Sequence, residues 1–174
     1  MQIKTQKIAV LGILLALASV TFLLEALIPP LLPIAPYVKL GLSNIFILLT
    51  IAWFSCLDGV IIVLAKNIIT AFVSGWFAFL FNIAGSLVAF FSMYFMYKFC
   101  FPKISFLAIS VMGAVFSNIM RTATAALLLT APSLFLQLPI VTAVSIGGGL
   151  LVGSITALIV QILPKKLQQD FCSL

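Results

Sequence analysis

Six apolar runs, each bounded by proline, glycine or a charged residue, occupy almost the whole of this 174-residue chain. Only 7% of its residues are charged and 64% are hydrophobic, whereas a soluble domain carries about 25% charged residues. So little polar surface cannot cover a water-soluble globule. A helix of about 20 apolar residues, by contrast, can cross a bilayer with its backbone hydrogen bonds satisfied internally. The sequence therefore predicts an all-α integral membrane protein.

Helix-breaking residues divide the chain into six expected transmembrane helices within a single membrane domain, residues 1–174. The breaks fall at Pro29-Pro30, Leu57-Asp58-Gly59, Gly75, Pro102 and Pro132, because proline cannot continue a helix and glycine weakens one. Prolines between residues 29 and 39 predict an extended or re-entrant segment. Most runs exceed the minimum of about 17 residues for a span, and the second and third lie near it. The expected helices are 7–28, 40–55, 58–74, 77–99, 104–129 and 138–163.

Basic residues gather at alternate helix ends, which predicts the orientation. With the N-terminus inside, the cytoplasmic ends would carry Lys4, Lys7, Lys98, Lys103, Lys165 and Lys166. The outer loops would carry only Lys39, so the positive-inside rule places both termini in the cytoplasm of a multi-pass protein of the cell membrane. Because the basic residues are scattered over helix ends, they indicate the orientation of the helices in the membrane and not a nucleic-acid-binding surface. Trp53 and Trp76 are expected in the interfacial belts.

Two cations, Lys66 and Arg121, lie inside apolar runs of a chain with only three acidic residues. A Lys or Arg at the centre of a membrane helix costs roughly 2.5–3.5 kcal/mol on insertion scales, so such groups usually face a bundle interior. With too few carboxylates to neutralise them, they predict a pocket for an anionic ligand. Two alternatives stay open: Lys66 could extend to an interface, and backbone carbonyls with Asn118 could satisfy Arg121.

Further polar residues are expected in the outer half of the same bundle, while the inner half is almost purely apolar. They are Glu25, Lys39, Asn44, Asn82 and Asn118. This asymmetry predicts a binding cavity open to the outside. Alternatively, Glu25 pairs with Lys39 as an interfacial salt bridge, and Asn44 and Asn82 join helices through hydrogen bonds.

Small residues recur at four-residue spacing in two of the expected helices. Gly149, Gly153 and Ala157 form such a ladder in the last helix, and Gly12 and Ala16, with Ala9 nearby, form one in the first. Small residues let helix backbones approach closely. The ladders serve either packing within the bundle or docking against another membrane subunit.

Residues needed for several kinds of catalysis are missing. The chain has no histidine, no pair of aspartates to hold Mg²⁺ on a diphosphate, and no phosphate-binding glycine loop. Cys56, Cys100 and Cys172 lie far apart and follow no metal-ligand spacing. We expect no enzyme activity, no catalytic residue, no metal and no cofactor.

One segment, Pro36-Tyr37-Val38-Lys39-Leu40-Gly41-Leu42-Ser43-Asn44, resembles the proteins called heptaprenyl diphosphate synthase component I, also known as Gx-type transporters. Their hallmark is a KLGLxN-like motif after a proline-containing loop, and Glu25 with Pro29 also matches. Weaker matches are 84–86 (Ala-Gly-Ser) and 110–114 (Ser-Val-Met-Gly-Ala). The chain departs from the family at Ser117, where His is common, near Arg121, where Gln is common, and near Lys66, where Arg is common.

That family is similar to the substrate-binding S-components of energy-coupling-factor (ECF) transporters, six-helix bundles that bind a small ligand from outside. The resemblance implies an uptake subunit for a small anionic compound, such as an isoprenoid or quinone precursor. It also implies a transmembrane coupling subunit, contacted through Ala9, Gly12 and Ala16, and two cytoplasmic ATPases. The family name supports an alternative, a non-catalytic membrane partner of a heptaprenyl diphosphate synthase. A stand-alone carrier is a third possibility.

Overall fold

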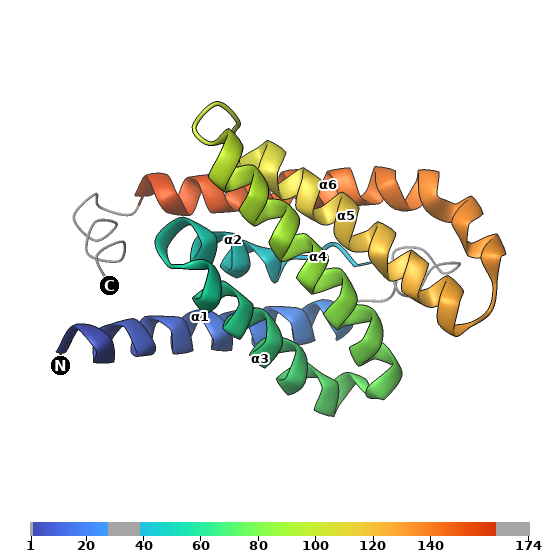
Figure 1. The fold of residues 1–174 in the computed structure, drawn as a ribbon, viewed down its shortest axis with the longest axis horizontal. Coiled ribbons are helices and arrows are strands. Elements are labelled where there is room, and N and C mark those ends of the chain that lie inside the picture. Colours follow the sequence, from blue (N-terminus) through green and yellow to red (C-terminus); the bar gives the residue numbers. More distant parts are fainter. Residues whose placement is uncertain (1, 28–38, 163–174) are drawn as a thin grey trace.

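The computed structural model describes residues 2–27 and 39–162, with side chains from Gln6 onward. The expectations for the proline-containing segment 28–38, Pro164, Lys165, Lys166 and Cys172 lie outside the described residues. Within them the protein is all-helical, with six α-helices and a short 3₁₀-helix, η1 (Figure 1). The elements are α1 (Gln2–Leu27), α2 (Asn44–Trp53), α3 (Cys56–Ser74), α4 (Trp76–Cys100), α5 (Phe106–Leu128), η1 (Pro132–Gln137) and α6 (Leu138–Ile162).

Five of these helical segments are long and apolar enough to cross a membrane, which makes this a multi-pass membrane protein. They lie close to the expected ranges because proline, glycine and polar residues interrupt the apolar runs at their ends. The start of α1 and the end of α6 lie at the same end of the bundle, the left of Figure 1.

The second expected span is much shorter than the sequence predicted. Helix α2 contains ten residues, Asn44–Trp53, and so measures about 15 Å, half the hydrocarbon thickness. Residues 40–43 are not helical, and Phe54 and Ser55 have extended backbones before α3 begins. The expectation of a helix over 40–55 is therefore wrong at both ends.

Helix α2 is short but central, because the other helices pack around it. Its Ile47, Leu48 and Ile51 contact one buried cluster that includes residues of α3, α4 and α5. On its other side, Ile45, Leu49 and Trp53 belong to a second cluster with residues of α1, α3 and α6. A helix that is apolar on all sides is typical of a buried position.

The two tryptophans have opposite environments. Trp53 is buried in the second cluster, so the expectation of an interfacial position is wrong for it. Trp76 is exposed at the start of α4 and stacks on Phe79, as an interfacial residue would. Hydropathy could not separate them, because both stand at the end of an apolar run.

The small-residue ladder of α6 serves packing within the bundle. A Cβ atom at Gly149 would lie 2.6 Å from the backbone of Val111, and one at Gly153 would lie 2.6 Å from the backbone of Leu107. Helices α5 and α6 thus approach until their backbones nearly touch. The ladder of α1 differs, since Ala9, Gly12 and Ala16 are exposed and nothing described lies within 4 Å of a Cβ at Gly12.

Candidate functional site

A non-helical strap, residues 39–43, carries the first part of the site across the bundle interior. The Glu25 carboxylate on α1 accepts hydrogen bonds from the backbone N–H groups of Gly41, at 2.7 Å, and Leu42, at 3.2 Å. The Asn118 amide on α5 donates to the carbonyl oxygen of Lys39 at 3.1 Å. These bonds replace the ones that the strap would make in a helix.

Two glycines allow the strap to adopt this path. Gly41 has φ +80°, a conformation that side chains disfavour. On α6, a Cβ at Gly148 would lie 2.6 Å from the carbonyl oxygen of Leu40. The strap is therefore fixed by α1, α5 and α6 together.

Lys66, in the middle of α3, is 1% exposed. Its Nζ donates to the Ser43 hydroxyl of the strap at 3.1 Å and lies 5.5 Å from the ring centroid of Phe22 on α1. The Nζ of Lys39 lies 3.7 Å from the same centroid. An aromatic ring attracts a cation through its quadrupole, so Phe22 holds both lysines. Lys66 points into the bundle, and the alternative in which it reaches an interface is wrong.

Arg121, on α5, is 4% exposed, and its Nε and Nη1 have no hydrogen-bond partner among the described residues. Its side chain passes directly over Gly85 of α4, where a Cβ atom would lie 2.6 Å from Nε. Asn118 does not satisfy the guanidinium; its amide donates to Lys39 and, at 2.9 Å, to the Ser145 hydroxyl. Leaving a buried donor unpaired costs about 1–3 kcal/mol, and more for a charged group.

Lys39, Lys66 and Arg121 form what we call the cation cluster. Electrostatic interactions join all three to one another and to Glu25. Glu25 nevertheless forms no ion pair with any of the three. Within residues 6–27 and 39–162 the ion pair that the structure contains is Lys7–Asp58. The expected Glu25–Lys39 salt bridge is therefore absent from this part of the chain. Among the described residues, Glu25 is thus the one negative group that interacts with the three positive groups of the cation cluster.

Lys39 belongs to the strap, outside the five long apolar helical segments. Burial lowers its pKa to about 8, the positive charge of Arg121 acts in the same direction, and Glu25 opposes both. Lys39 therefore loses its proton at a lower pH than an ordinary lysine does.

Two further predicted site residues are buried at the edges of this region. Asn44 begins α2 directly after Ser43 and is 7% exposed. Asn82 is 4% exposed and lies on α4 one turn before Gly85, hence on the face over which Arg121 passes. The structure thus brings Glu25, Lys39, Lys66, Asn118 and Arg121 together, with Asn44 and Asn82 beside them.

Several residues of the site did not stand out in the sequence. Phe22 had one usable signal, because it precedes Glu25 by three residues and so shares its helix face. Ser43 and Ser145 are of a residue type that is common in membrane helices. Nothing in the sequence around Gly85 indicates that an arginine side chain passes over it.

The expected partner-contact residues lie elsewhere. Ala9, Gly12 and Ala16 are exposed on α1, while Phe22 and Glu25 of the same helix are buried. Docking of this small face of α1 against a partner subunit stays a prediction.

A comparison with known protein families gives one match. The model of the family described as heptaprenyl diphosphate synthase component I matches residues 14–159, most of the chain and all of the cation cluster. No curated protein and no solved structure matches it. The resemblance indicated by the strap sequence is confirmed.

Proposed function

Because this chain belongs to the heptaprenyl diphosphate synthase component I family, we propose that it is the non-catalytic membrane component of such a synthase and binds a small anion in its cation cluster. The word "component" in the family description fits a chain that is not itself the enzyme. The prenyl-transfer chemistry then belongs to a separate subunit, which would supply the aspartates that hold Mg²⁺.

One observation carries the anion-binding part of the proposal, namely that two guanidinium nitrogens of Arg121 have no hydrogen-bond partner within residues 6–27 and 39–162. They lie in a buried region where Lys66 has a single described hydrogen-bond partner, a neutral hydroxyl. An anion would satisfy these donors and repay much of the cost of burying them.

Co-purification from native membranes tests the partner. The tagged protein, extracted in a mild detergent, should bring with it a soluble prenyl synthase subunit rich in aspartate. Isolation with a transporter ATPase and a membrane coupling subunit, and without a synthase, would contradict this assignment.

A second candidate function is the substrate-binding subunit of an ECF-type uptake system for a small anionic isoprenoid or quinone precursor. The exposed small face of α1 favours it, because the equivalent ladder on α6 is covered by α5 whereas Ala9, Gly12 and Ala16 remain available to a partner helix.

Gly12→Leu, compared with Gly147→Leu, tests this second function, because a Cβ at either glycine meets nothing described within 4 Å. Only Gly12→Leu should release coupling subunits. Equal effects of the two glycine variants would contradict a docking role for the small face of α1.

Lys66→Gln combined with Arg121→Gln should abolish uptake while leaving membrane insertion intact.

A further inference from the structure

The formal charges of the site define how much negative charge a bound ligand needs to neutralise it. With all four groups ionised, Lys39, Lys66 and Arg121 carry three positive charges and Glu25 one negative charge, and these groups interact electrostatically inside the bundle. Lys7–Asp58, the ion pair of the described region, does not involve them. An excess of two positive charges in a low-dielectric interior is strongly unfavourable.

The neutral neighbours of the lysines preserve this excess. Phe22 holds both ammonium groups with its ring, at 3.7 Å and 5.5 Å from the centroid, and Ser43 offers a hydroxyl to Lys66. These contacts fix the positions of the cations without neutralising them. The glutamate that could neutralise one of them instead uses both oxygens to hold the strap.

We propose that the cation cluster binds a dianionic phosphoryl group, a phosphate monoester or a diphosphate, with Arg121 as its direct hydrogen-bond donor. This inference rests on the proposed function, because it specifies the charge and chemical class of the anion. Together with Glu25, a phosphate monoester dianion neutralises the three cations, whereas a monoanion such as a simple carboxylate leaves one positive charge buried. In a diphosphate the terminal phosphoryl group supplies these two negative charges, and the inner phosphate carries one more.

A phosphoryl group also fits the placement of the donors. The three cations come from three separate parts of the chain, the strap, α3 and α5. Several oxygens on one phosphorus can accept bonds from donors that approach from different directions, and guanidinium is well suited to phosphate. The ligand charge and the donor arrangement lead to the same chemical class.

This group could belong to a soluble prenyl diphosphate or to a membrane lipid whose headgroup is a phosphate monoester. The shared chemistry is the terminal dianionic phosphoryl group, and the site geometry is the same for both. The experiment therefore needs one arm for each source.

Binding of two matched anion pairs to the purified protein in detergent tests the charge. Methyl phosphate and dimethyl phosphate, and sulfate and methanesulfonate, all compared at pH 7, differ mainly by one negative charge within each pair. The dianion of each pair should bind at least about tenfold more tightly, the value of one charged hydrogen bond. Arg121→Gln should remove this preference, whereas Lys103→Gln, at the exposed α4–α5 turn, should retain it.

Equal or tighter binding of the monoanions would overturn the dianion proposal while leaving anion binding intact. Binding of neither kind would overturn the anion-binding function itself. A short prenyl diphosphate in detergent, and phosphatidate in phosphatidylcholine nanodiscs, then identify the source. Competition with methyl phosphate in either arm supports the proposal, and competition in neither overturns it.

Discussion

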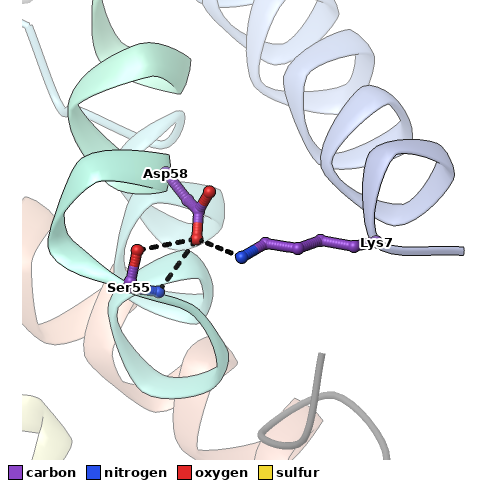
Figure 2. Close-up of polar contacts among 3 residues, drawn as sticks. All are labelled: Lys7, Ser55 and Asp58. Atoms are coloured by element: carbon purple, nitrogen blue, oxygen red, sulfur yellow. Dashed lines mark hydrogen bonds and ion pairs between the residues drawn. The ribbon is translucent and has the colours of Figure 1, made fainter. Parts of the chain in front are cut away.

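Two charged groups of residues in this protein show opposite uses of charge. At the end of the bundle where α1 and α3 begin, Lys7 and Asp58 form an ion pair of 2.9 Å (Figure 2). The same Asp58 oxygen accepts from the backbone N–H of Ser55, at 3.1 Å, and from its hydroxyl, at 2.9 Å. In the cation cluster, Lys39, Lys66 and Arg121 are buried or partly buried, and none lies within ion-pair distance of Glu25.

The difference separates the structural role of Lys7–Asp58 from the binding role that we propose for the cation cluster. At Lys7–Asp58 each charge has its partner within the chain, and Asp58 also stabilises the first turn of α3, where a negative charge is favourable. The cation cluster gains nothing comparable from the fold, so its charges destabilise the empty protein. This cost is explained if the residues are kept for a ligand.

Replacing Lys66 and Arg121 together by methionine should produce the largest effect. We expect anion affinity to fall by about a hundredfold or more, because two charged donors are lost. We expect the melting temperature to rise or stay unchanged, because apolar side chains replacing buried charges are neutral or stabilising by about 1–4 kcal/mol. Thermal unfolding and anion titration in the same detergent measure both, with Lys103→Met as the control.

A fall in melting temperature with unchanged anion affinity would show that the cluster is structural, like Lys7–Asp58. The cation cluster and the Lys7–Asp58 pair would then have the same kind of role.

Gly85→Ala should disturb the site from the side of α4. The new Cβ would lie 2.6 Å from Nε of Arg121 and 3.1 Å from the backbone oxygen of Ser117, so Arg121 must move. We expect roughly tenfold weaker anion binding and a loss of about 1–3 kcal/mol in the free energy of unfolding. Gly147→Ala is the matched control on α6, because a Cβ there meets nothing described within 4 Å. Similar results for both variants would contradict the placement of Arg121.

Raising the pH should weaken binding through Lys39, whose pKa is lowered to about 8. Above that pH the ammonium loses its proton, so sulfate, a dianion throughout this range, should bind about fivefold more weakly at pH 9 than at pH 7. Glu25, Lys66 and Arg121 are the charged groups that face Lys39. Lys39→Arg keeps its charge and should flatten the dependence, and an equally steep profile in this variant would exclude Lys39 as a source of it.

Lys7→Met should produce the smallest effect. The Lys7 and Asp58 side chains are 26% and 14% exposed, and an ion pair near the surface contributes about 0.2–1 kcal/mol. A double-mutant cycle of Lys7→Met and Asp58→Asn should give a coupling energy in this range, with unchanged anion affinity. A change in anion affinity would link the two regions and refute their separate roles.

Sequence patterns located the helices well wherever a helix has an apolar run of full length and a clear break. They failed at 40–55, where the run is equally apolar but the strap carries hydrogen bonds to Glu25 and Asn118 in place of helical ones. Hydropathy measures composition along the chain. It does not register that Glu25 and Asn118, which are far apart in the sequence, both hydrogen-bond to the same segment.

For the candidate site, the sequence pointed to the charged residues and the asparagines, but not to Phe22, Ser43 or Gly85 beside them. Lys66 and Arg121 stand out because an ionisable group in an apolar run is costly and so rarely accidental. Phe22 and Gly85 belong to residue types that membrane helices use everywhere, and only their positions beside the cations give them a role.

The sequence by itself determined that this chain is a multi-pass helical membrane protein with more basic than acidic groups in its apolar runs. Both follow from counting residues, because apolar spans and the ionisable groups inside them are visible in the composition along the chain. Only the tertiary structure decided that α2 is a short central helix and that Glu25 is committed to the strap. It also decided that, in the part of the chain that the structure describes, two nitrogens of Arg121 have no hydrogen-bond partner. These outcomes depend on distances between groups remote in sequence, which packing alone fixes.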